Sequence, residues 1–584
     1  MYMKNINIKL FLLVIFLLIT GCATDDRLYR LNTFNNSTFC GEAAQPVDID
    51  ATKIDDKFKE VGLREPTNNT LLCSIQAYNR NHAVSYDLAF VEMLDFGDRK
   101  GTKTQIDALN NYIDLQLKKE EDLWVYVFVH GWRHNADIGD EDVAKFHTML
   151  ALSKNHLNQR KLNAKVLGIY VGWRGKSMDE AVPLVDIPYK TGISFFSRKT
   201  QSDKNAVFLQ EFIKELETQL KAKPEKSNKL ITIGHSLGGN MLLRAVEPLI
   251  TETIKKTSIG EIVKGFGDLV VLLNPASELS NWQKLQNASR EHAGIADPKK
   301  YSYLDDSECN YLARDISPTY KEKCKAEGTH HVYAKGQLPV AISLTSSKHL
   351  KKIKPTDEDI KQRKLTNNGN TDIATSLFFP LSQRIKNWFG EDEDIYALGQ
   401  SLPKRAWNKD GKPDHEASAN LIYGLSHEME IDGATNIGTN YANALKTDGI
   451  SCSADRTFLT SEIENHIKLS EHPPKAEEGK TQKYSITGGR GWDRGKLKIG
   501  KAKAADGTHG IEINVKHGVL RNKCSSRSKA EIAECDLGNS YQVPRLGHAR
   551  EPYWNIAAHQ NLIDGHGGYV SAALFCFVNG LVIP

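Results

Sequence analysis

Short apolar runs alternate with helix-like patterns over much of this 584-residue chain, and that alternation limits the possible folds more than any other feature. The runs are rich in β-branched and aromatic residues, as buried strands are, and the segments between them place apolar residues three or four positions apart. Strands that alternate with helices form a mostly parallel sheet covered on both faces, with functional loops at the carboxyl ends of the strands. The fold class is therefore expected to be α/β. The expected strands are residues 86–94, 123–129, 166–171, 230–233, 269–273, 338–344 and 553–557, and the expected helices are residues 104–117, 143–157, 207–220, 240–250 and 571–582.

The composition fits a globular protein and argues against nucleic-acid binding. The chain has 76 basic and 72 acidic residues, a net charge of +4, which provides no basic surface of the kind that nucleic acid requires. The glycine-rich segment 488–496 lacks the spacing of a phosphate-binding loop, and the His-Glu pair at 427–428 lacks the second His of a zinc site. No cofactor and no metal is therefore expected.

The N-terminus has the pattern of an export signal. Basic residues precede an apolar run at residues 10–19, which is too short to span a bilayer and is typical of a secretory signal peptide. The quartet Ile-Thr-Gly-Cys at 19–22 resembles the lipobox of bacterial lipoproteins, in which the Cys is acylated and the preceding peptide is removed. The resemblance implies a signal peptide at 1–21 and a lipid anchor on Cys22 in the bacterial cell envelope. Ala23 at the next position favours the outer membrane.

Cysteine usage fits an exported protein. Once Cys22 is set aside, eight of the nine cysteines remain, and none forms a Cys-x-x-Cys pair. In an oxidising compartment an even number of cysteines indicates disulfides rather than metal thiolates. Proximity in the sequence favours the pairs Cys40–Cys73, Cys309–Cys324 and Cys524–Cys535 and leaves Cys452 and Cys576 unassigned.

A Gly-x-Ser-x-Gly motif directly follows the expected strand 230–233, in the sequence Gly-His-Ser-Leu-Gly-Gly at 234–239. A serine at such a strand-to-helix bend is strained, and it needs flanking glycines because a Cβ there would collide with neighbouring backbone. The bend raises the serine hydroxyl above the sheet, so the motif predicts Ser236 as a nucleophile. The N-terminus of the following helix directs the Leu237 backbone N–H at a developing oxyanion.

A second oxyanion donor is expected in the loop after an earlier strand, where His-Gly-Trp occupies residues 130–132. Gly131 allows close approach of the backbone, and the Trp132 backbone N–H is the candidate donor. We expect the ring of His130 to pack and hydrogen-bond locally rather than to transfer a proton.

Four segments in this order resemble the α/β-hydrolase family, in particular its bacterial lipase-like and esterase-like members. The resemblance implies an α/β-hydrolase fold with a long insertion before the final strand, and cleavage of carboxylic esters, lipid esters included, through an acyl-enzyme. The four segments are residues 127–132, 170–175, 234–239 and 273–276. The implied organisation is a signal peptide at 1–21, a lipidated tether and cystine-closed lead-in at 22–83, the hydrolase core at 84–380, an insertion or cap region at 381–547, and the last strand and helix of the core at 548–584.

The resemblance also implies an acid after a later strand and a His after the last one. Asp372 is favoured as the acid because a Thr-Ser pair and a Phe-Pro pair bracket it as they do in the family, although the basic stretch 346–371 intervenes. Glu278 remains the alternative acid. His566 lies between glycines and is favoured as the base, with His559 second.

These residues predict a membrane-anchored serine hydrolase that acts on an ester or lipid substrate. One alternative is a phospholipase or acyltransferase that uses the same acyl-enzyme. The other is a non-catalytic envelope scaffold that binds a partner through the 381–547 insertion. We expect the insertion to cover or border the pocket, because it separates the acid from the His in the chain.

Overall fold

The described part of the chain lies mostly in the segments where strands and helices alternate. The computed structural model describes residues 28–30, 47–48, 73–80, 84–95, 99–137, 139–175, 188–258, 261–292, 337–346, 406–407, 413–414, 427–433, 451–453, 496–503, 510–517, 552–558, 563, 566–569 and 572–582. The signal peptide, Cys22, Asp372 and His559 lie outside these residues, as does the basic stretch from residue 347 onward.

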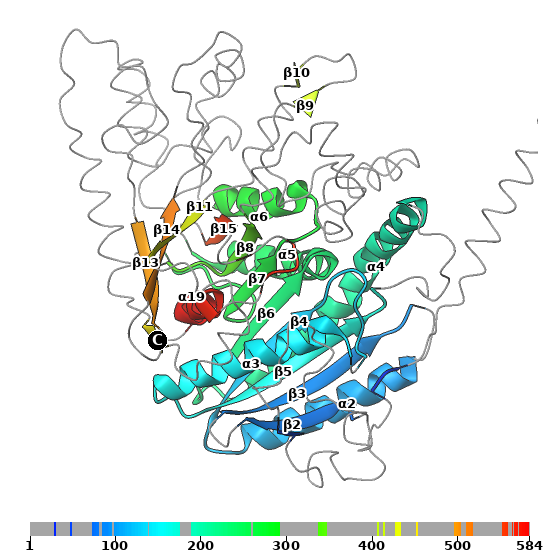
Figure 1. The fold of residues 1–584 in the computed structure, drawn as a ribbon, viewed down its shortest axis with the longest axis vertical. Helices are drawn as coiled ribbons and strands as arrows, with labels where there is room; N and C mark the ends of the chain where they lie inside the picture. The colour runs from blue at the N-terminus through cyan, green and yellow to red at the C-terminus, as the bar shows by residue number, and fades with distance from the viewer. Residues whose placement is uncertain are drawn as a thin grey trace, which may run out of the picture.

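A mostly parallel sheet forms the centre of the fold, as expected for the α/β class. Its strands follow the order β1-β2-β3-β5-β4-β6-β7-β8-β15-β11-β14-β13-β12, and Figure 1 shows the sheet running from β2 (blue) to β13 (orange). Seven consecutive strands of this order pair in parallel, and all six pairings between them have continuous register. These strands are β3 (Val84–Met93), β4 (Asp122–Val129), β5 (Ala164–Trp173), β6 (Lys229–His235), β7 (Leu269–Leu273), β8 (Ala341–Ser346) and β15 (Tyr553–Ala558).

Strands from the two polar segments extend this sheet at both ends. At one end β2 (Ile75–Arg80) pairs antiparallel with β3, and β1 (Val47–Asp48) pairs with β2. At the other end β11 pairs with β15, and β14, β13 and β12 follow it. Strand β11, within the segment 381–547, thus adjoins the strand that precedes His566 in the chain. The strands of this segment are β9 (Ala406–Trp407) and β10 (Pro413–Asp414), which form a separate pair, and β11 (His427–Gly433), β12 (Ser451–Ser453), β13 (Lys496–Lys503) and β14 (Gly510–His517).

Helices cover both faces of the sheet and create two apolar layers. On β4 the side chains of Trp124, Tyr126 and Phe128 join the layer that contains α3 and α19. Val125 and Val127, between them in the sequence, join the opposite layer with α2, α4, α5 and α6, because successive strand residues point to opposite faces. The helices are α2 (Arg99–Leu117), α3 (Glu141–Gln159), α4 (Pro188–Lys221), α5 (Leu237–Lys256), α6 (Leu279–His292) and α19 (Ala572–Val582).

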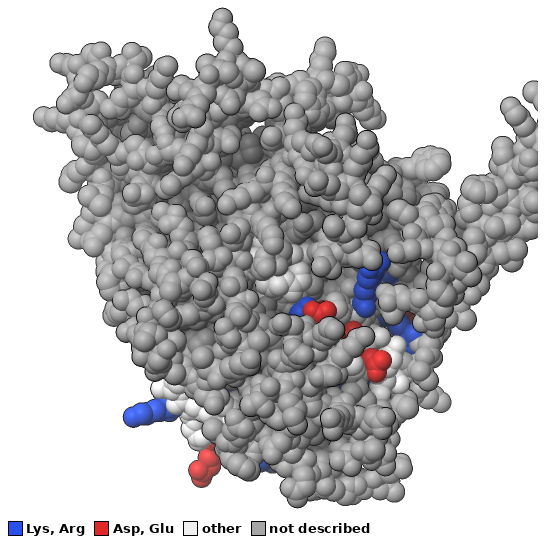
Figure 2. All heavy atoms as spheres, viewed as in Figure 1, with Lys and Arg blue, Asp and Glu red and all other residues white. Residues whose placement is uncertain are grey.

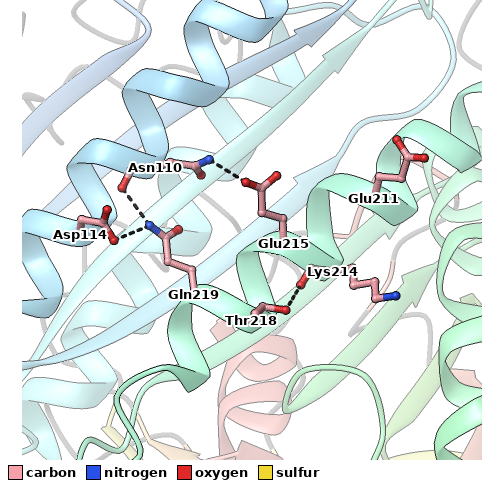
Figure 3. A pocket seen from close by; sticks show the side chains of 7 residues that line it. All are labelled: Asn110, Asp114, Glu211, Lys214, Glu215, Thr218 and Gln219. Carbon is pink, nitrogen blue, oxygen red and sulfur yellow. Dashed lines mark hydrogen bonds between the residues drawn. The ribbon is translucent and has the colours of Figure 1, made fainter.

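The described surface has mixed charges and one polar groove. Figure 2 shows basic and acidic side chains next to one another on the described part of one face. A groove between α2 and α4 is lined by polar side chains that hydrogen-bond to one another, such as Gln219 to Asp114 at 2.8 Å and Asn110 to Glu215 at 3.2 Å (Figure 3).

Among the described helices, none is long and apolar enough to cross a membrane.

One predicted cysteine pairing falls partly within the described chain. Cys73, next to β2, is buried and disulfide-bonded. Its expected partner, Cys40, lies outside the described residues, as do both members of the pairs Cys309–Cys324 and Cys524–Cys535. The pairing of Cys40 with Cys73 therefore stays a prediction.

Candidate functional site

Ser236 lies in a strained turn between β6 and α5. Its backbone has φ 53° and ψ −119°, in a region that residues other than glycine rarely adopt. The glycines of the motif are required sterically: a Cβ on Gly238 would lie 2.2 Å from the carbonyl oxygen of Val129, and one on Gly234 would lie 2.8 Å from that of Gly238. The local geometry is therefore that of the strand-turn-helix bend expected from the motif.

Strained residues gather at one edge of the sheet. Besides Ser236, Arg133 has φ 71° and Asn274 has φ 43°, and these three residues follow the carboxyl ends of β6, β4 and β7. Among the described residues other than glycine, positive φ occurs elsewhere only at Lys161, in the turn after α3. Strain that persists at adjacent strand ends is typical of a functional site, because the surrounding structure must hold it in place.

His566 approaches Ser236 from the loop after β15. Its Nε2 lies 2.8 Å from the Oγ of Ser236, although 330 positions separate the two residues in the chain. Both side chains are nearly buried, with exposed fractions of 3% for Ser236 and 6% for His566. The geometry is that of a hydroxyl within hydrogen-bond reach of a base. The structure thus brings together two of the three residues expected for the triad, and the third, Asp372, lies outside the described residues.

The His-Gly-Trp loop after β4 lies directly against the serine. A Cβ on Gly131 would lie 2.8 Å from the Nδ1 of His235 and 3.1 Å from the Cβ of Ser236, so a side chain there would force these neighbours to shift. Trp132 anchors the next turn of the loop, since its indole packs edge-on against Phe195 and its Nε1–H donates to the Oγ of Ser194 at 3.4 Å. Leu237 is the first residue of α5, where backbone N–H groups have no partner within the helix.

His130 has the local structural role that the sequence favours. Its Nδ1 donates to the carbonyl oxygen of Gly131 at 2.9 Å, and its Nε2 accepts from the backbone N–H of Trp173 at 3.0 Å. This pair of contacts requires a neutral ring, and burial accordingly lowers the pKa of His130 to about 4. The ring therefore ties the end of β4 to the end of β5 and has no free nitrogen for proton transfer.

A buried carboxylate, Asp142, lies beneath the site and was not expected from the sequence. Its Oδ1 accepts from the hydroxyl of Tyr569 at 2.6 Å, and its Oδ2 accepts from the backbone N–H of Gly131 at 3.4 Å. Burial alone would raise the pKa of Asp142, but His134 and Lys145 outweigh it and hold the pKa well below its ordinary value. The ionised side chain thus joins the loop of Gly131 to the loop of His566, since Tyr569 is three residues after that His.

Two further side chains hold the backbone of His566. Its carbonyl oxygen accepts from the Nε2–H of His235 at 3.0 Å and from the Nδ2–H of Asn274 at 2.9 Å. The Nδ1 of His235 faces the Oδ2 of Asp142 at 3.7 Å, which is beyond hydrogen-bond distance. Asn274 also accepts from the backbone N–H of Ser346, the last residue of β8, at 2.9 Å. The end of β8, from which the chain leads to Asp372, therefore adjoins the loop of His566.

Glu278, the alternative acid, belongs to a different cluster. Its Oε1 contacts Lys199 at 2.7 Å and its Oε2 contacts Arg244 at 3.0 Å, while Asn281 donates to Oε2 at 2.8 Å. Burial alone would raise the pKa of Glu278, but the two cations outweigh it and hold the pKa far below the ordinary value. Both oxygens are thus engaged by groups of α4, α5 and α6, on the face of the sheet opposite α19.

Asp142, His235 and Asn274 were not expected at the site, and each of them contacts a residue distant in the chain. Asp142 carries a weak local signal as a charged residue in the first turn of α3. His235 and Asn274 each lie next to or within a motif that follows a strand, but nothing local indicates their contacts with His566. Within the described residues, no group of three His, Cys, Asp or Glu lies close enough together to hold a metal ion.

Comparisons with known proteins add little to this geometry. No family model matches the chain, and no curated protein matches it. A solved structure, phospholipase PlaB from Legionella pneumophila, matches 75% of this chain and 93% of its own length at 13% identity, with a TM-score of 0.20. A similarity at this level carries no argument about fold or activity.

Proposed function

We propose that this chain is a membrane-anchored serine hydrolase of the α/β-hydrolase fold that cleaves carboxylic esters. The observation that carries the proposal is the strained Ser236 with the Nε2 of His566 at 2.8 Å from its hydroxyl. The bend supports a nucleophile elbow, and the order of Ser before His in the chain fits that fold.

The residues support an acyl-enzyme mechanism. The Oγ of Ser236 attacks the ester carbonyl carbon while the Nε2 of His566 takes the hydroxyl proton. Backbone N–H groups of Leu237 and Trp132 stabilise the tetrahedral oxyanion, and His566 then gives its proton to the departing alcohol. Water, activated by the same His, releases the acid and restores the serine. Asp372 orients His566 in this proposal, which the contact between Asn274 and Ser346 supports because it holds the end of β8 beside the His loop.

Lipidation of Cys22 and location at the outer membrane complete the proposal, supported by the lipobox-like quartet at 19–22 and by Ala23. A fluorophosphonate probe tests the chemistry, since it labels an activated serine. We expect labelling of the wild-type protein at Ser236 and none of Ser236→Ala. An unlabelled wild-type protein would favour the envelope scaffold instead. Product analysis with added alcohol acceptors distinguishes hydrolysis from acyl transfer.

A further inference from the structure

Three residues near the N-terminus, Leu28 to Arg30, lie firmly against the catalytic domain. The backbone N–H groups of Tyr29 and Arg30 donate to the two carboxylate oxygens of Glu92, at 2.9 Å and 2.8 Å. Gln105 donates to the carbonyl oxygen of Arg30 at 3.2 Å and to the carboxylate of Glu92 at 3.1 Å. Arg30 is 2% exposed, and its guanidinium lies over the ring of Phe90. This docked segment is thus fixed by buried polar contacts.

The docked segment lies at the same edge of the sheet as the candidate site. Glu92 is the penultimate residue of β3, at its carboxyl end. The side-chain amide of Asn135 donates to the hydroxyl of Tyr29 at 3.1 Å, and Asn135 belongs to the loop that begins with Gly131. In the sheet order β3 and β6 are three strand spacings apart, about 15 Å, so the docked segment contacts a strand close to the one that carries Ser236.

The chain between the docked segment and Cys22 is short. Five residues, 23–27, separate Cys22 from Leu28, so even an extended chain spans only about 21 Å. A compact domain of some 300 residues is about 50 Å across, more than twice that reach. A lipid on Cys22 would therefore hold the edge with Ser236 near the bilayer, because the tether is too short for this edge to turn to the far side.

We propose that the sheet edge carrying Ser236 faces the membrane in which Cys22 is anchored, because Leu28 to Arg30 dock beside the catalytic loops, and that the substrate is an acyl lipid of that membrane. This inference rests on the proposed function. A short tether holds the active site at a high effective concentration of membrane lipid, whereas a soluble ester gains nothing from the anchor.

Tether length tests the proposal directly. Twenty Gly/Ser residues inserted after Thr24 lengthen the tether, and the same insert after Asn36 is a matched control that leaves the link from Cys22 to Leu28 unchanged. The full-length acylated proteins are reconstituted in phosphatidylethanolamine/phosphatidylglycerol vesicles. Fatty-acid release from the vesicles and hydrolysis of soluble p-nitrophenyl butyrate are then measured.

The insert after Thr24 should lower vesicle-lipid hydrolysis by about ninefold, because effective concentration falls roughly as the −3/2 power of tether length. The control insert, and hydrolysis of the soluble ester by both variants, should match the wild type. Equal lipid hydrolysis by the two insertion variants, with the soluble ester still cleaved, would overturn the proposal. An unacylated Cys22 in the mass spectrum would overturn it too. If the wild-type protein cleaves neither ester, the proposed function itself is wrong.

Discussion

The carbonyl oxygen of His566 accepts from the side chain of Asn274 at 2.9 Å, while the ring of the same His lies 2.8 Å from the hydroxyl of Ser236. Asn274 follows β7 and Ser236 follows β6, so neighbouring strand ends fix the backbone and the ring of one residue. His566 is therefore positioned from two sides, as the base of the proposed mechanism would have to be.

Ser236→Ala should lower ester turnover by about four to six orders of magnitude, because the nucleophile and its base act as a unit. The melting temperature should stay nearly unchanged, since the hydroxyl contributes little packing. Kinetics with p-nitrophenyl esters and thermal unfolding of the same samples measure both effects. His559→Gln is a control for the base: turnover that persists in His566→Gln but disappears in His559→Gln would reverse the assignment.

Asp142→Asn should lower kcat for esters by about ten- to a hundredfold with a smaller change in KM. The substitution removes the charge that holds the N–H of Gly131 and the hydroxyl of Tyr569, and small displacements of catalytic loops are costly. Tyr569→Phe removes one of these contacts and should have a smaller effect in the same direction. Asp107→Asn, at an exposed ion pair on α2, is the control and should leave kcat unchanged. A loss confined to KM would contradict a positioning role.

The sequence predicts the central strands to within a few residues, because their apolar runs overlap the buried strands. The run 230–233 became β6 (Lys229–His235), and 123–129 became β4 (Asp122–Val129). Helix α4 begins at Pro188, well before the expected 207, because polar residues hide the helical period of its first half. Strands β2 and β11 lie in polar segments without alternation, and their place at the sheet ends depends on pairing with distant strands.

The site was only partly predictable for a related reason. The sequence indicates Ser236 because its motif encodes a local bend, and it favours His566 because glycines flank it. Asp142 has no such signature, since its partner Tyr569 is 427 positions away in the chain. Roles of this kind follow from the folded arrangement and are absent from any local pattern.

His156 should make the protein less stable as the pH falls. Within the described structure neither ring nitrogen has a hydrogen-bond partner, and burial, assisted by Arg160, lowers the pKa of His156 to about 4. The folded state thus favours the neutral ring. Its stabilising contribution is complete above the ordinary pKa of about 6.5 and is lost as the pH falls towards 4.

His156→Leu should therefore reduce the pH dependence of the free energy of unfolding between pH 6.5 and 4, by up to about 1.4 kcal/mol per pH unit. Urea unfolding at several pH values measures the slope. His156→Asn is polar but does not titrate, so it should reduce the slope equally even if it is less stable at pH 7. An unchanged slope in both variants would assign the acid sensitivity to other groups.

The last prediction separates the two candidate acids. Glu278→Gln should destabilise the fold by about 1–3 kcal/mol, because the buried ammonium of Lys199 loses its charged contact with Glu278, at 2.7 Å, but keeps the carboxylate of Asp203, at 2.8 Å. Because the pKa of Glu278 is lowered in the folded state, the contribution of its carboxylate to the free energy of unfolding is complete above its ordinary pKa. This contribution is lost as the pH falls below that value, so the stability of the variant should differ less from that of the wild type in acid. At neutral pH and low temperature, the folded fraction of Glu278→Gln should retain ester turnover within about tenfold of wild type. Asp372→Asn should show the opposite pattern, with stability retained and kcat lowered by about four orders of magnitude, as expected when a His loses its orienting carboxylate. Turnover lost in Glu278→Gln and kept in Asp372→Asn would move the acid to the end of β7, where its oxygens would first have to leave Lys199 and Arg244.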